Sequence, residues 1–220
     1  MHDLRHILDV KKHQIETTLN GLFDDVRTAV AGAVACLEQR DPDYCRSLIE
    51  NDVRLNDKRR LIEQDCLVAI ASQQPVAHDL RDIVADMRIA VELERMGDYA
   101  SDIASSVLEL DGGNLQALGL ADVLAMSALC QRMLADAQQA RKTGDAALAR
   151  KLAATDDELD ARLQRIVSTT LAAMRADPDL VNNGSRMLWI AHDLERCGDR
   201  ATNIAEQVVY RVEGVVEELD

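Results

Sequence analysis

Residues 93–104 read LERMGDYASDIA, and residues 194–205 read LERCGDRATNIA. Eight of the twelve positions are identical, which indicates two copies of one unit about a hundred residues apart. Each copy contains Glu-x-x-x-Asp, formed by Glu94 with Asp98 and by Glu195 with Asp199. A spacing of four residues places two side chains on one face of an α-helix. The repeat therefore decides the fold and marks one candidate site in each half.

The composition of the chain is typical of packed helices. Of the 220 residues, 47% are hydrophobic, only 2% are aromatic and three are proline. β proteins usually contain more aromatic and turn-forming residues. Apolar residues recur at the 3–4 spacing of amphipathic helices. This pattern predicts helices at 15–41, 42–73, 75–110, 123–140, 145–175 and 178–212, with a proline near the start of the second, third and sixth.

The strongest break in the helical pattern is Gly112-Gly113-Asn114, after which the pattern restarts. We therefore expect an all-α fold of two tandem three-helix bundles related by the internal repeat, with six long antiparallel helices in total. Residues 1–112 would form the first three-helix repeat and residues 113–220 the second.

The charge of the chain limits its ligands. The formal net charge of −14 repels nucleic acid and anionic membranes, and it suits cations or basic protein surfaces. The five cysteines form no C-x-x-C pair, which favours reduced core residues in a cytosol. The longest apolar run, residues 29–37, is far shorter than the ~20 residues of a membrane span. We expect a cytoplasmic protein with no direct membrane insertion.

The acids of the repeat continue apolar stripes, so they should point toward the bundle or its edge. Glu94 and Glu195 each take the next step of the 3–4 alternation in their helix. Like charges at this spacing repel, and the repulsion grows when they are partly desolvated. Gly97 and Gly198 each cost up to ~1 kcal/mol relative to Ala in mid-helix, and a missing side chain lets a helix or ligand come close. A cation should compensate the acids.

The preceding helices supply matching polar residues. Asp52 with Asn56, and Asp156 with Asp160, again lie four apart and are related by a shift of about 104. Oxygen ligands alone suit iron, manganese, magnesium or calcium, whereas a closed structural zinc site usually uses Cys or His. These pairs could complete a site opposite each Glu-x-x-x-Asp motif.

A structural explanation competes with the metal site. A single Glu-x-x-x-Asp is usually a solvated helix face, and Arg95 and Arg196 could form surface ion pairs with their neighbours. His78 and His192 have no counterpart in the other copy, which favours structural roles. The basic run 58–60 is typical of a solvated helix face. The scattered Met and Cys residues are typical of a core.

Longer segments resemble a known family. Residues 193–210 read DLERCGDRATNIAEQVVY after DPDLV at 177–181, and residues 74–83 read QPVAHDLRDI ahead of the first motif copy. Over nearly the whole chain these segments resemble the PhoU family of phosphate-transport accessory proteins. The resemblance implies two three-helix bundles, each with a metal site. The metal it implies is iron first, with zinc, manganese, magnesium and calcium as alternatives.

Site residues follow from the resemblance by position. The first site would consist of Asp52, Glu94 and Asp98, and the second of Asp156, Asp160, Glu195 and Asp199. The chain departs from the pattern in the first repeat. Asn56 replaces an acid there, and Asp102, a further candidate ligand, stands where the second copy has Asn203. These departures allow the two sites to differ in affinity or metal count.

The resemblance also implies a function without catalysis. It implies a negative regulator of phosphate uptake and of the phosphate-starvation response, acting as a homodimer. Such a protein links the ATP-binding subunit of the phosphate ABC transporter to a sensor histidine kinase. One alternative is an iron store or di-iron enzyme, although the Glu-x-x-His motif of carboxylate-bundle enzymes is absent. The other is a plain helical scaffold or dimerisation module with solvent-facing acids.

Overall fold

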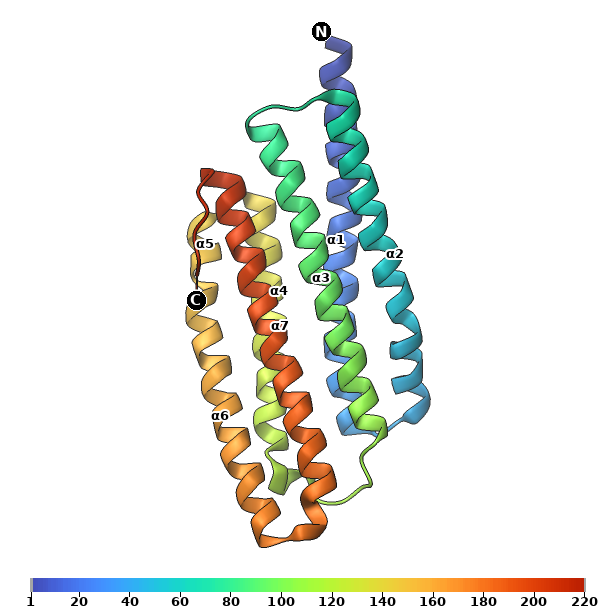
Figure 1. Cartoon of the computed structure of the whole chain (residues 1–220), viewed down its shortest axis with the longest axis vertical. Coiled ribbons are helices and arrows are strands. Elements are labelled where there is room, and N and C mark those ends of the chain that lie inside the picture. Colours follow the sequence, from blue (N-terminus) through green and yellow to red (C-terminus); the bar gives the residue numbers. More distant parts are fainter. Residues whose placement is uncertain (1, 220) are drawn as a thin grey trace.

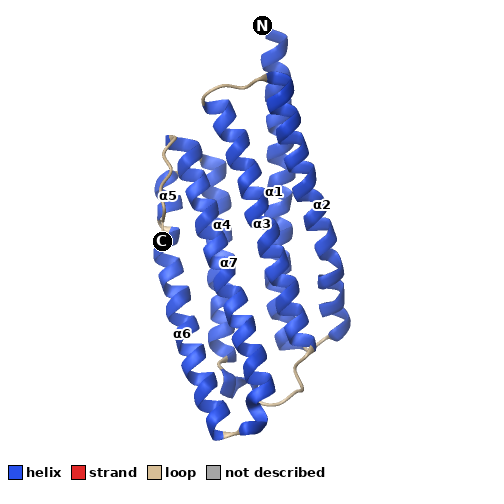
Figure 2. Cartoon of the chain, viewed as in Figure 1, coloured by secondary structure: helices blue, strands red, loops and turns tan. Residues whose placement is uncertain are grey.

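The computed structural model describes residues 2–219, and every regular element within that range is a helix (Figure 2). The first repeat contains α1 (His2–Gln39), α2 (Pro42–Gln73) and α3 (His78–Leu108). The second contains η1 (Leu115–Leu118), α4 (Leu120–Thr143), α5 (Ala146–Arg150), α6 (Leu152–Ala176), η2 (Pro178–Leu180) and α7 (Val181–Glu213). The predicted all-α fold of two tandem three-helix bundles is confirmed.

The two bundles lie side by side, with their long axes roughly aligned (Figure 1). α3 and α7 pack against each other along the centre, while α2 and α6 lie on opposite outer sides. α1 also contacts α4, and buried apolar residues of both repeats form one continuous cluster. Both motif copies therefore lie on the central helix pair, each facing the outer helix of its own repeat.

One helix begins at its proline as predicted, and another does not. Pro42 lies in the first turn of α2, where the Asp41 carboxylate accepts hydrogen bonds from two backbone N–H groups at 3.0 and 3.2 Å. Pro75, in contrast, does not begin α3. It follows Gln74, a left-handed residue (φ 47°) that closes α2, and Ala77 also has positive φ (49°). The α2–α3 loop is therefore longer than predicted.

The predicted fifth helix is interrupted. α5 ends at Arg150, and α6 begins after Lys151, whose backbone N–H donates to Leu148 O at 3.1 Å in a tightened turn. α5 packs against α7, and Arg150 pairs with Glu213 and Glu217 near the end of the chain. The sixth predicted helix likewise starts with η2 before α7.

The core is built as the composition predicts. All five cysteines are free and buried, and Phe23, Leu93 and Met96 are fully enclosed. Among the helices of residues 2–219, none combines the length and apolar character that a membrane span requires.

Candidate metal sites

The first site lies between α2 and α3. Asp52 is half-buried; Asn56 Nδ2 donates to its Oδ2 at 2.8 Å, and its Oδ1 is buried without a hydrogen-bond partner. Burial raises the pKa of Asp52, and the charge of Asp102 adds to this. Burial, followed by the charges of Glu94, Asp52 and Asp102, raises the pKa of Asp98 to about 6. The acids predicted for this site therefore lie close enough to repel one another.

One basic residue lies inside the first site, contrary to the sequence prediction of a solvated face at 58–60. The Arg59 side chain is only 23% exposed; its Nη1 donates to Glu63 Oε2 at 2.7 Å, and its Nη2 lies 3.6 Å from Glu94 Oε1. Lys58 pairs with Asp25 of α1. The prediction was wrong for Arg59 because this helix face turns toward the acids of α3. The first site thus carries an internal counter-charge.

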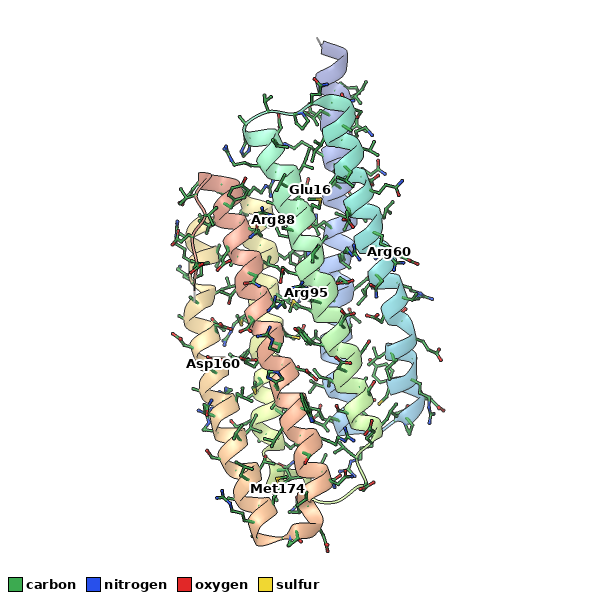
Figure 3. The ribbon with its side chains drawn as sticks, in the orientation of Figure 1. Glu16, Arg60, Arg88, Arg95, Asp160 and Met174 are labelled. Carbon is green, nitrogen blue, oxygen red and sulfur yellow. The ribbon has the colours of Figure 1, made fainter. Side chains whose placement is uncertain are left out.

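The second site lies between α6 and α7, and its basic neighbour is Arg196. Burial first, then the charges of Asp199 and Asp160, raise the pKa of Asp156 to about 6. Burial and the charge of Asp199 raise the pKa of Glu195 to about 7. Asp156 Oδ1 and Glu195 Oε2 are both buried without a hydrogen-bond partner, while Asp199 accepts from Arg196 at 2.6 Å. Figure 3 labels the exposed Asp160 on α6.

Two glycines allow these acids to approach the central helices. A Cβ on Gly198 would lie 2.8 Å from Asp156 Oδ1 and 2.5 Å from Leu159 Cδ2. In the first repeat, a Cβ on Gly97 would lie 2.5 Å from Leu55 Cδ1. Real Cβ atoms do not tolerate such distances, so the Leu and Asp side chains opposite these glycines would have to move. The predicted role of the glycines in close approach is confirmed.

We therefore expect Gly198→Ala to destabilise the protein. The substitution gains up to ~1 kcal/mol of helix propensity, but overpacking costs ~1–3 kcal/mol and displaces Asp156. Gly21→Ala is the matched control, because a Cβ there meets only Lys58 Nζ at 3.6 Å, an ordinary contact. In urea unfolding, the free energy of unfolding should fall for Gly198→Ala and rise for Gly21→Ala. Equal gains at both positions would mean that the close approach imposes no constraint.

His192 lies beside the candidate second site, a position that the sequence did not predict. Its Nδ1 lies 3.5 Å from Glu195 Oε2, a buried oxygen without a hydrogen-bond partner. The i,i+3 spacing to Glu195 was a signal for this contact. His78, in contrast, lies away from both sites, 3.5 Å from Asp82. The charge of Asp102 also acts on a residue outside the first site. Burial, followed by this charge, raises the pKa of Asp193 on α7 to about 7.

The carboxylate oxygens of both sites are suitable ligands for a cation, but they do not surround a common point in this structure. Within residues 2–219, no three His, Cys, Asp or Glu side chains converge tightly enough to hold a metal ion as they stand. One carboxylate of each site contacts an arginine instead: Glu94 lies 3.6 Å from Arg59, and Asp199 lies 2.6 Å from Arg196. The unpartnered oxygens and the excess of negative charge in each repeat nevertheless suit a hard or borderline cation.

Comparison with known proteins finds the same division into two repeats. A PhoU domain profile matches residues 19–107 and 123–208, one match in each repeat. The chain belongs to the PhoU family.

Relatives of this PhoU-family chain align over most of its length. The Phosphate-specific transport system accessory protein PhoU homolog of Pseudomonas aeruginosa is 30% identical, covering 94% of this chain and 90% of the relative. The homologue of the same name from Caulobacter vibrioides is 34% identical, covering 90% and 85%. Crystal structures of PhoU from P. aeruginosa (TM-score 0.89, 30% identity) and Streptococcus pneumoniae (0.87, 28%) cover 94% and 96% of this chain, and 99% of their own. The PhoU fold extends through both repeats.

Proposed function

We propose that this chain is a regulatory accessory protein of phosphate transport and that it is not an enzyme. Its relatives are named accessory proteins of a phosphate-specific transport system, and the streptococcal structure is described as a phosphate transport system regulatory protein. Family membership through both repeats supports the same role here.

The regulation we propose is negative and acts through protein contacts in the cytoplasm. The chain, as a homodimer, would link the ATP-binding subunit of a phosphate ABC transporter to a sensor histidine kinase. It would limit phosphate uptake and the starvation response. An acidic surface with net charge −14 favours basic faces on such partners. Binding to the purified ATP-binding subunit should weaken as salt rises, because surface charges are screened; no detectable binding at any salt concentration would contradict the adaptor role.

Each repeat would also bind a metal ion, with iron the first candidate and zinc, manganese, magnesium or calcium the alternatives. The observation that carries this proposal is the pair of unpartnered buried oxygens, Asp52 Oδ1 and Asp156 Oδ1, at corresponding positions of the two repeats. The ligands would be Asp52, Glu94, Asp98 and Asp102 in the first site, and Asp156, Asp160, Glu195 and Asp199 in the second. A bound cation would offset the carboxylate repulsion and join the outer helix of each repeat to the central pair.

Elemental analysis of the purified protein tests the metal proposal. We expect metal in the wild type and its loss from a variant carrying Glu94→Ala, Asp98→Ala, Glu195→Ala and Asp199→Ala. Circular dichroism would show that the variant is still helical. A wild type free of metal after purification without chelators would contradict the proposal. Oxygen-dependent turnover by the iron-loaded protein would instead favour the di-iron alternative.

A further inference from the structure

We propose that His192 is an additional ligand of the second site and gives that site a preference for borderline transition metals over hard cations. The first site, built from oxygen donors, would lack this preference. The inference rests on the proposed metal binding and concerns which ion each repeat selects.

The imidazole of His192 lies next to a carboxylate of the second site. His192 lies one turn before Glu195 on α7, and its Nδ1 is 3.5 Å from Glu195 Oε2. That oxygen is buried and makes no hydrogen bond, and the 3.5 Å separation is longer than the usual N–H···O distance. The imidazole is 49% exposed and the Glu195 side chain 19%, so His192 lies at the mouth of the site. An imidazole nitrogen thus lies beside a carboxylate oxygen that makes no hydrogen bond, and both are potential metal ligands.

A neighbouring aromatic ring contacts this imidazole. The Trp189 indole packs edge-on against His192, with ring centroids 6.2 Å apart and an interplanar angle of 64°. Edge-to-face contacts of this kind are favourable, and they limit the orientations that a ring samples. Metal-bound His residues commonly have their ring orientation fixed by neighbouring groups. The Trp189 contact therefore restricts the orientations of the imidazole that we propose as a ligand.

The corresponding surface of the first repeat is different. By the shift of 101 residues that relates the two motif copies, Val91 corresponds to His192 and Arg88 to Trp189. Arg88 turns toward α7, where its guanidinium lies 5.7 Å from the Tyr210 ring centroid. The first site contains Asn56, whose Nδ2 donates to Asp52 Oδ2, and the counter-charge of Arg59, where the second site has Arg196. The repeats therefore differ at this position in donor chemistry, because only the second has an imidazole there.

Donor chemistry determines which ions bind. Imidazole suits zinc, copper, iron and nickel, whereas carboxylates, carbonyls and water suit magnesium, calcium and manganese. One nitrogen among carboxylates raises affinity for the first group with little effect on the second. The second site would therefore select Ni²⁺ or Zn²⁺ over Mg²⁺ more strongly than the first.

Trp189 makes the test specific to the second site, because it is the only tryptophan in the chain. Metal-free full-length protein would be titrated with Ni²⁺, a fluorescence quencher, and with Mg²⁺. Tryptophan emission would report on the second site and calorimetry on both sites. We expect Ni²⁺ to quench the wild type, and His192→Ala to weaken this Ni²⁺ binding by at least about tenfold while leaving Mg²⁺ affinity nearly unchanged. Val91→His, the matched gain variant, should raise Ni²⁺ affinity in the first site without altering the quenching of Trp189.

The outcomes separate this inference from the proposal on which it depends. Unchanged Ni²⁺ affinity in His192→Ala, with circular dichroism showing a folded chain, would overturn the role of His192 and leave metal binding intact. Equal weakening of Ni²⁺ and Mg²⁺ would also overturn it, because the imidazole would then not discriminate between ions. A wild type that binds neither ion by calorimetry would remove the proposed metal sites themselves.

Discussion

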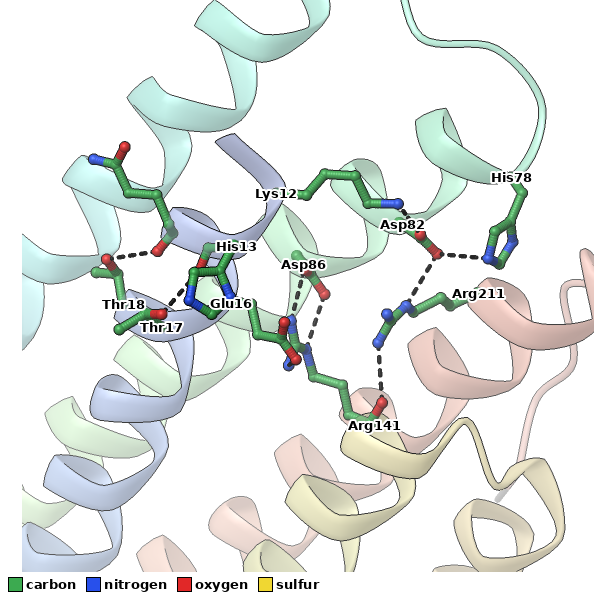
Figure 4. A network of polar contacts seen from close by, with 11 residues as sticks. Lys12, His13, Glu16, Thr17, Thr18, His78, Asp82, Asp86, Arg141 and Arg211 are labelled. Carbon is green, nitrogen blue, oxygen red and sulfur yellow. Dashed lines mark hydrogen bonds and ion pairs between the residues drawn. The ribbon is translucent and has the colours of Figure 1, made fainter. Parts of the chain in front are cut away.

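Replacing Arg141 with Met is expected to lower the free energy of unfolding by about 3–5 kcal/mol, the usual cost of removing one partner from a buried ion pair. Arg141 lies on α4 and is only 1% exposed; its Nε and Nη2 donate to the two oxygens of Asp86 at 2.9 and 2.7 Å (Figure 4). Without the guanidinium, the Asp86 carboxylate of α3 would remain buried and uncompensated. Because the pair joins α3 of the first repeat to α4 of the second, the substitution should weaken the interface between the repeats.

The surrounding network extends this connection to four helices. Arg211 of α7 donates to Asp82 at 3.1 Å and to the backbone oxygen of Arg141 at 3.0 Å, and Lys12 of α1 donates to Asp82 at 2.6 Å (Figure 4). Charges shared among α1, α3, α4 and α7 hold one end of the paired bundles together. Arg141→Met keeps the backbone oxygen and the Asp82 carboxylate that Arg211 contacts, so the loss should come from the buried Arg141–Asp86 pair itself.

Urea unfolding would measure the effect, with two comparisons. Arg150→Met removes a solvent-screened ion pair with Glu213 and Glu217, so it should cost much less. The double variant Asp86→Leu/Arg141→Met should recover much of the loss, because it leaves no unpaired buried charge. A cost for Arg141→Met as small as that for Arg150→Met would show that the buried pair does not stabilise the interface.

Raising the pH from 5 to 8 in metal-free buffer is expected to destabilise the protein. The pKa of Asp156 is raised to about 6, and the pKa values of Glu195 and Asp193 to about 7, in each case mainly by burial. The folded state therefore binds these protons more tightly than the unfolded state. The resulting stability is fully present below the unfolded values, near pH 4, and is lost as the pH rises through 6 and 7. With about 1.4 kcal/mol for each pKa unit, a loss of about 2 kcal/mol or more is expected.

Urea unfolding at pH 5 and pH 8 in the presence of a chelator would measure this loss. Asp156→Asn/Glu195→Gln should flatten the dependence, because neither amide titrates. A divalent cation that binds the charged carboxylates should restore stability at pH 8, since ligands of the native state stabilise it. Stability that rises from pH 5 to pH 8 in the chelated wild type would contradict the desolvation argument.

Local sequence signals were sufficient for the six main helical segments, although not for the break between α5 and α6, and they placed two acids on one face of α3 and of α7. The apolar period, the Asp41 cap before Pro42 and the duplicated Glu-x-x-x-Asp motif each act within one or two helical turns. The length of the Gln74–Ala77 loop was not predicted, because a proline can follow the end of one helix as readily as begin the next.

The sequence by itself determined an all-α chain of two repeats with a pair of acids on one face of each third helix. Only the tertiary structure decided that α3 packs against α7, that Arg59 turns inward to Glu94, and that Arg141 meets Asp86 across the two repeats. Helical periodicity is a property of neighbouring residues, and it shows which side chains share a face. The charge that each face meets depends on how distant helices pack, and that packing is set by the whole core.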